Sequence, residues 1–189
     1  MAGSAVGLWL FASDDVRPRV VPWLETFCDG VKIARDGDVS FWVRDGTAIA
    51  LDALSPGETG AFFLSDDECV PADDEDYSAF ARPPVQSLIL DAGRSGRTHD
   101  LVLGHLALAL AARLDALIDF DGVLGYPTPR DETRDPADLT RARALVASLP
   151  GRVEEVSYDT GGGGRWFRHV GDTEFLAAWL RHPDFHLGD

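Results

Sequence analysis

Apolar residues in the first part of the chain fall into short runs separated by turn residues. Residues 5–11 (A-V-G-L-W-L-F) form one apolar run, which predicts a buried strand. Acidic residues at the start of a helix interact favourably with the helix dipole. A helix is therefore expected after Asp15, continuing to Phe27. Residues 31–33 and 39–43 flank an Asp-Gly turn, which is typical of a hairpin. This part therefore begins with a strand, a helix and two paired strands.

Pro22 is expected to kink or shorten the first helix, because proline removes a hydrogen bond inside a helix. Two further apolar stretches, residues 48–51 and 61–64, are short strands or parts of a connection.

The second part of the chain repeats the alternation of strands and helices. A run of leucines and alanines over residues 98–114 is apolar on nearly all sides, which predicts a buried helix. Asp172 is placed to cap the last helix. The other expected elements are strands over 86–91, 116–120, 153–158 and 165–170, a Pro-rich loop over 126–136, a glycine tip at 161–164, and helices over 138–149 and 173–181.

This order of elements predicts an α+β fold, with a two-layer sandwich of a sheet and helices. The chain is expected to form a single compact domain over residues 1–189. Within it, residues 1–65 and 86–189 are hypothesised to be two ferredoxin-like halves, joined by an acidic linker over 66–85.

The overall charge narrows the classes of partner. The formal net charge is −15, from 32 acidic and 17 basic residues. Such a surface repels nucleic acid and anionic membranes, and it speeds encounter with a basic protein. No apolar run reaches the roughly 18 residues of a membrane span and no signal peptide is recognisable, so the cytoplasm is the expected location. Cys28 and Cys69 are therefore expected to be free thiols.

Acidic residues concentrate between the two predicted halves. Seven of them occur without a single basic residue: Asp66, Asp67, Glu68, Asp73, Asp74, Glu75 and Asp76. This pattern predicts an exposed loop that could bind a basic partner. Trp166, which follows the glycine tip, could be an exposed aromatic anchor for the same purpose.

The segment L-I-D-F-D-G-V-L, residues 117–124, suggests a different function. It resembles the first motif of haloacid-dehalogenase-type phosphatases, in which two aspartates act as nucleophile and as acid and base. The resemblance implies a small metal-dependent hydrolase that uses Asp119 and Asp121. The rest of the motif set is missing, because no lysine follows Leu124. The structural interpretation is that a core strand ends here and Asp121-Gly122 forms the turn.

The remaining candidate motifs do not have the spacing of a catalytic or metal site, and no cofactor or metal is predicted. The turn G-R-S-G-R-T, residues 93–98, lacks the spacing and the Gly-Lys pair of a phosphate loop. His99 and His105 are six residues apart, which does not place them on one helix face. His105 is expected to be a hydrogen-bonded residue of the core or of the helix surface.

Three segments resemble a family of uncharacterised bacterial proteins of about this length. They are A-L-I-D-F-D-G-V-L (116–124), L-P-G-R-V-E-E-V-S-Y (149–158) and G-D-T-E-F-L-A-A-W-L-R-H-P-D-F (171–185). The small, acidic, two-layer α+β character is similar to that of immunity proteins of bacterial toxin systems. The expected function is therefore a non-enzymatic cytoplasmic binding protein that neutralises a basic toxin through an acidic surface.

Overall fold

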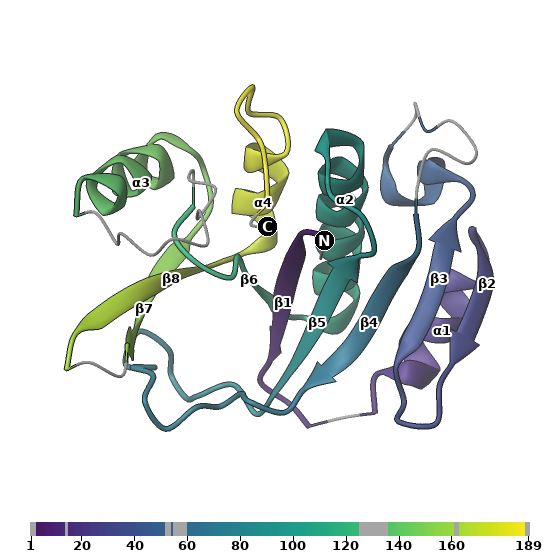
Figure 1. The fold of residues 1–189 in the computed structure, drawn as a ribbon, viewed down its shortest axis with the longest axis horizontal. Coiled ribbons are helices and arrows are strands. Elements are labelled where there is room, and N and C mark those ends of the chain that lie inside the picture. The colour runs from purple at the N-terminus through teal and green to yellow at the C-terminus, as the bar shows by residue number, and fades with distance from the viewer. Residues whose placement is uncertain are drawn as a thin grey trace.

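A computed structural model of the chain describes residues 3–13, 15–51, 54, 60–124, 136–160 and 163–187. Its centre is an eight-stranded antiparallel sheet with the order β2-β3-β4-β5-β1-β6-β8-β7 (Figure 1). The strands are β1 (Ala5–Leu10), β2 (Cys28–Ile33), β3 (Val39–Val43), β4 (Phe62–Asp67), β5 (Gln86–Ala92), β6 (Leu117–Asp119), β7 (Val153–Asp159) and β8 (Arg165–Gly171). The predicted α+β class is confirmed.

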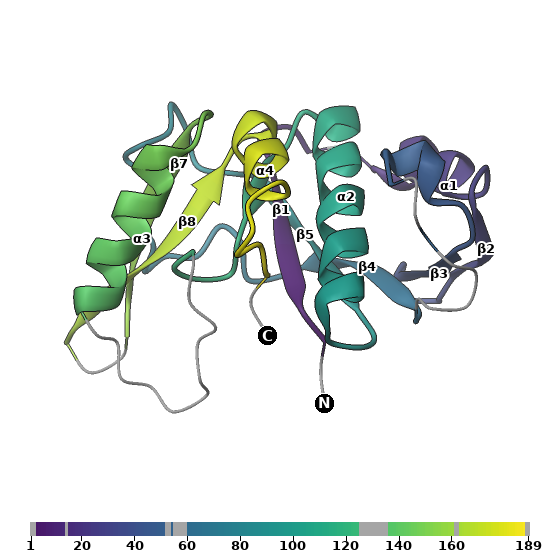
Figure 2. The ribbon, with the colours of Figure 1, turned by 90° about the horizontal axis from the view of Figure 1, so that it is seen from above.

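Helices cover one face of this sheet. Figure 2, seen from above, shows α2 (Arg97–Leu114) and α4 (Thr173–Trp179) lying over the strands. The two remaining α-helices are α1 (Arg17–Leu24) and α3 (Pro136–Ser148). Alternate strand residues such as Leu8, Leu90 and Ile118 point into the large core beneath these helices and are completely buried. Among the described residues, no helix combines the length and the apolar character needed to cross a membrane.

The strand order interleaves the two halves that the sequence suggested. Strand β1 lies between β5 and β6 and is antiparallel to both. The unit β5-α2-β6 is therefore a split β-α-β unit, and its middle strand comes from the first half of the chain. The two halves share one continuous sheet through β1.

At one end of the sheet, the face opposite the helices is covered by the segment between β4 and β5. After β4 the chain runs along the bottom of the sheet in Figure 1 before it returns to β5. Val70, Tyr77 and Phe80 from this crossing segment, residues 68–85, pack on a second core around Trp9. The rings of Tyr77 and Phe80 contact Trp9 edge-on, at centroid distances of 5.5 and 5.9 Å.

This arrangement corrects the prediction that residues 66–85 form an acidic linker. Asp66 and Asp67 extend β4, since they pair with Leu88 and Ser87 of β5. The expectation that they belong to an exposed loop is wrong. The pleat of the strand also sends successive side chains to opposite faces, so these two acids cannot form one surface.

Other element boundaries differ by a few residues. Helix α1 ends at Leu24 instead of Phe27, with Pro18 in its first turn and Pro22 inside it. A short 3-10 helix, Gly46–Ile49, replaces the strand considered over 48–51. Asp172 caps α4 as predicted, since its Oδ1 accepts a hydrogen bond from the Phe175 N–H at 2.8 Å.

Two predicted segments cannot be compared with the structure, but the prediction that both cysteines are free thiols can. Residues 126–135 of the expected Pro-rich loop and residues 161–162 of the glycine tip lie outside the described residues, and Pro136 begins α3. Cys28 is a buried free thiol and Cys69 is an exposed one.

Candidate functional site

The two candidate sites from the sequence meet at one place, on the face of the sheet opposite the helices. Asp119 is the last residue of β6 and is buried. Its neighbour Ile118 points into the helix-side core, so the pleat turns Asp119 to the other face. Gly7 lies directly opposite on β1, and a Cβ there would come within 2.9 Å of the Asp119 Cβ. A glycine at this position makes room for the carboxylate.

Arg168 links Asp119 to the acidic segment. It lies on β8, next to β6 in the sheet. Its Nη1 donates to Asp119 Oδ2 at 2.9 Å, and its Nη2 lies 2.9 Å from Glu75 Oε1. The guanidinium also lies over the ring of Tyr158, 5.4 Å from the centroid. One arginine thus joins a central strand to the crossing segment.

The crossing segment is fastened around Glu75. Tyr77 donates a hydrogen bond to Glu75 Oε2, and its hydroxyl oxygen accepts one from the Ala72 N–H at 3.0 Å. The Asp76 N–H donates to the Ser157 carbonyl of β7 at 2.9 Å. Only 3% of the Glu75 side chain is exposed. The prediction that Glu75 belongs to an exposed acidic surface is therefore wrong.

Burial governs the protonation of this cluster. It raises the pKa of Asp119, and the Arg168 charge opposes that rise. Burial also raises the pKa values of Asp121 and Glu75. For Arg168, burial favours the neutral form, but Asp119 and Glu75 outweigh it and raise its pKa. The cluster sets three carboxyl groups against one guanidinium.

The turn after β6 uses the second aspartate as the sequence suggested. Asp121 has a φ of 51° and Gly122 a φ of 143°, so both residues adopt turn conformations with positive φ. The Asp121 N–H donates to Asp119 Oδ1 at 2.9 Å. Both Asp119 oxygens therefore accept hydrogen bonds within the fold. No group of three or more His, Cys, Asp and Glu side chains suited to a metal ion occurs in the part of the chain that the structure describes.

The remaining acids of the segment are placed differently from Glu75. Glu68, Asp73, Asp74 and Asp76 are exposed. Asp76 Oδ1 accepts a hydrogen bond from the Ser78 N–H at 3.0 Å, and hydrogen bonding by Ser78 lowers the Asp76 pKa. These four residues, called the acidic surface below, lie on a segment that the Glu75 contacts hold against the sheet.

Trp166 lies on the same side of the sheet as the cluster. It pairs with Tyr158, which in turn forms an isolated β-bridge with Glu75. Trp166 is partly buried. The structure thus brings the predicted aromatic residue close to the segment that carries the acidic surface.

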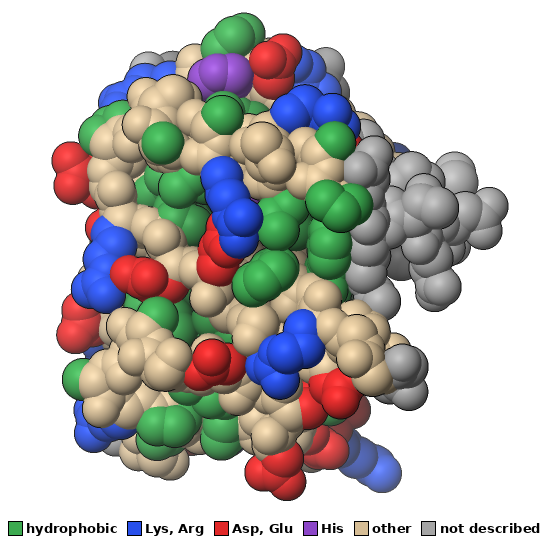
Figure 3. Space-filling view, turned by 90° about the vertical axis from the view of Figure 1, so that its left-hand side faces the viewer, with side chains coloured by type: hydrophobic (Ala, Val, Ile, Leu, Met, Phe, Trp, Pro, Cys, Tyr) green, Lys and Arg blue, Asp and Glu red, His purple; other side chains and the backbone are tan. Residues whose placement is uncertain are grey.

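The end of the molecule formed by α3 and β7 has a mixed character. Figure 3 shows basic and acidic side chains next to one another among apolar side chains on this end. Arg143 of α3 donates from Nε and Nη2 to the two carboxylate oxygens of Glu155, both at 2.6 Å. His169 is buried beneath, and its Nδ1 accepts the Leu124 N–H at 3.0 Å. Positive and negative side chains alternate on this end, so it does not present an electrostatic potential of a single sign.

The sequence analysis missed Arg168 and Tyr77. A signal for Arg168 was present, because it shares one face of its strand with Trp166 and Val170, and a charged residue on an apolar face is expected to have a buried partner of opposite charge. Which acid supplies that partner depends on the strand order and on the path of the crossing segment. Neither follows from the local pattern.

Comparison with protein families places this chain within one of them. A model of DUF6368, a family of unknown function, matches residues 2–188. The predicted resemblance to an uncharacterised family is confirmed, and nothing in the match links it to immunity proteins. No curated protein and no solved structure matches the chain.

Proposed function

The chain belongs to DUF6368, a family of unknown function, and we propose from its geometry that it is a non-enzymatic binding protein for a basic protein partner. The partner would be a toxin if the chain acts as a cytoplasmic immunity protein. The observation that carries the proposal is the ion pair between Arg168 and Glu75, which holds the segment bearing the acidic surface against the sheet. A segment fixed before binding loses less conformational entropy when a partner docks.

Electrostatics supports a basic partner. The exposed carboxylates of the acidic surface are part of a formal net charge of −15. Charge of one sign raises the rate of encounter with a partner of opposite charge, and salt weakens the effect. Steric occlusion of the partner's active surface would be the inhibitory mechanism.

Within this proposal, Asp119 and Asp121 have a structural role. Asp119 accepts hydrogen bonds from Arg168 and from the Asp121 N–H, so its oxygens stabilise the cluster beneath the docking segment. No contact in the described part of the chain favours the hydrolase alternative over this role.

The test begins with a pull-down from the source cells using the tagged full chain at low and high salt. The captured basic protein is then purified, and its association rate with the wild type is measured against ionic strength. We expect the triple variant Asp73→Asn, Asp74→Asn, Asp76→Asn to associate about tenfold more slowly at low salt, with a flatter salt dependence.

A matched control removes three exposed acids on other parts of the molecule: Glu25→Gln, Asp115→Asn, Asp184→Asn. It has the same net charge as the triple variant but keeps the acidic surface. Equal association rates for the two variants would show that only net charge matters. Wild-type rates in the triple variant would reject the acidic surface as the docking site.

A further inference from the structure

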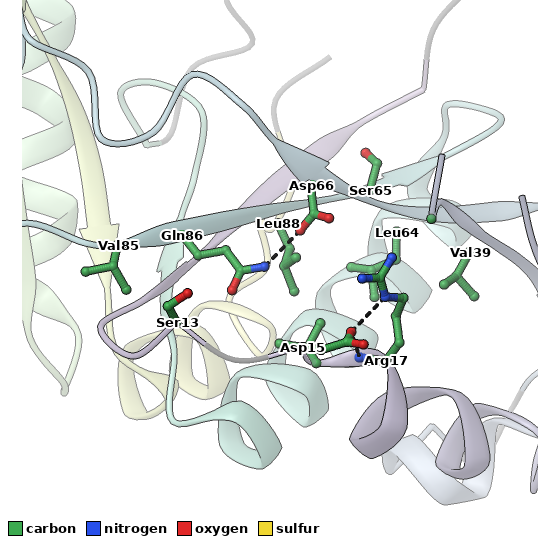
Figure 4. Close-up of a pocket in the computed structure, with 12 residues that line it drawn as sticks. Ser13, Asp15, Arg17, Val39, Leu64, Ser65, Asp66, Val85, Gln86 and Leu88 are labelled. Atoms are coloured by element: carbon green, nitrogen blue, oxygen red, sulfur yellow. Dashed lines mark hydrogen bonds and ion pairs between the residues drawn. The ribbon is translucent and has the colours of Figure 1, made fainter. Parts of the chain in front are cut away.

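A cavity of about 300 Å³ lies on the helix side of the sheet, away from the Arg168 cluster. It opens between the start of α1, the turn between β2 and β3, and the neighbouring ends of β4 and β5 (Figure 4). Its volume is at the lower end of the range for small-molecule sites, about 300–1,000 Å³.

The floor of the cavity is apolar. Val16, Val39, Leu64 and Leu88 line it, and each of them is buried. Leu64 and Leu88 come from adjacent strands on the helix-facing side of the sheet. An apolar body of a ligand would displace water from this floor without leaving a polar group unpaired.

Arg17 is held in place at one side of the cavity. Its Nε donates to Asp15 Oδ1 at 2.7 Å, and the same oxygen accepts the Arg17 N–H at 3.2 Å. Its Nη1 lies against Gly37, where an added Cβ would come within 2.2 Å of that nitrogen. Gly37 has a φ of 101°, so both its conformation and its lack of a side chain suit this position. The Nη groups donate to no described residue.

Asp66 forms the other side of the cavity. Its Oδ1 accepts a hydrogen bond from Gln86 Nε2 at 2.9 Å, as Figure 4 shows. Asp15 and, more weakly, Asp66 raise the pKa of Arg17, while burial opposes that rise. The two charged groups are therefore close enough to interact across the apolar floor. Asp66 Oδ2 accepts no hydrogen bond from a described residue.

We infer that this cavity binds a small zwitterion, a molecule with an amino group and a carboxylate on a short apolar body. The Nη groups of Arg17 receive the carboxylate, since a guanidinium presents parallel donors to that group. Asp66 receives the ammonium, and Val16, Leu64 and Leu88 contact the apolar body. A free apolar amino acid has this chemistry. The site is independent of the acidic surface, which lies on the other side of the sheet.

The test titrates the full-length protein with L-leucine while amide chemical shifts are followed by NMR. Two compounds serve as matched probes: 3-methylbutylamine lacks the carboxylate, and 4-methylpentanoate lacks the amino group. We expect saturable shifts at Gly37, Val39 and Leu88 with L-leucine, no shift at the remote Gly163, and affinities weaker by about tenfold or more for both probes.

Variants separate the two ends of the ligand. Arg17→Gln and Asp66→Asn should each weaken L-leucine binding by about tenfold or more, because each removes one charge-assisted interaction. Arg181→Gln and Asp184→Asn, exposed residues outside the cavity, are controls and should bind as the wild type does. Equal binding of the amine and L-leucine would overturn the role of Arg17. A lack of any shift with L-leucine, L-valine or L-isoleucine would overturn the zwitterion site.

Discussion

Arg168 Nη2 lies 2.9 Å from Glu75 Oε1, while Nη1 of the same guanidinium lies 2.9 Å from Asp119 Oδ2. The arginine therefore joins a segment that crosses the sheet to a strand near its centre. Such a contact is long-range in sequence and buried in space. Its energetic value depends on the balance between the attraction of the charges and the cost of removing them from water.

Glu75→Gln tests whether this contact holds the crossing segment in place. The amide keeps the shape of the side chain but loses the charge that pairs with Arg168. We expect the free energy of unfolding to fall by about 1–3 kcal/mol, the cost of weakening a hydrogen bond to a charged group. The amide of Asp76, which donates to Ser157, should exchange faster with solvent. Denaturant titration and hydrogen exchange measure the two effects.

Asp74→Asn is the control for that variant, because it removes a neighbouring exposed charge and leaves the ion pair intact. Unchanged exchange at Asp76 in Glu75→Gln would mean that other contacts, such as Tyr77 on Trp9, fix the segment without help from Arg168.

Arg168→Met should be the more damaging change. It leaves Asp119 and Glu75 buried without their cation, and removing one partner of a buried ion pair costs about 3–5 kcal/mol. Adding Asp119→Asn should recover part of the loss, so the double variant is destabilised by less than the sum of the single effects. Chemical denaturation of the four proteins gives the coupling energy. Additive effects would contradict a direct interaction between the two side chains.

Asp121→Asn makes a prediction about pH. Burial raises the pKa of Asp121 in the folded protein, so the folded state binds this proton more tightly than the unfolded state does. Ionisation at pH 7 therefore costs stability, and the amide avoids that cost. Asparagine also tolerates the positive φ at this position.

We expect Asp121→Asn to be more stable than the wild type at pH 7. The difference should shrink as the pH falls through the raised pKa and level off below the ordinary value of 3.8, where the Asp121 carboxyl group is protonated in both the folded and the unfolded state. Thermal unfolding at a series of pH values measures it. A constant difference across this range would show that the carboxyl group is not perturbed by burial.

The phosphatase resemblance gives a direct activity test. A hydrolase that used Asp119 would turn over 4-nitrophenyl phosphate with Mg²⁺, Mn²⁺ or Zn²⁺, and Asp119→Asn would abolish that turnover. We expect no turnover from the wild type, because both Asp119 oxygens accept hydrogen bonds from Arg168 and the Asp121 N–H. Metal-dependent turnover that Asp119→Asn removes would contradict the binding-protein proposal.

Local patterns in the sequence determined most of the elements and the α+β class. The apolar periodicity of residues 98–114 fixed a buried helix, and the Asp-Gly turn fixed a hairpin, because both depend on neighbouring residues alone. Asp172 was identifiable as a cap, and Asp121-Gly122 as a turn, for the same reason. The concentration of acidic residues around Asp73 was also evident from the sequence.

Only the tertiary structure decided which of these residues meet. The insertion of β1 between β5 and β6 sets β6 beside β8, and this order places Asp119 next to Arg168. The pleat of β4 sends Asp66 to the helix side of the sheet and away from the acidic surface. Long-range pairing depends on how the whole chain buries its apolar faces, so a window of neighbouring residues does not contain it.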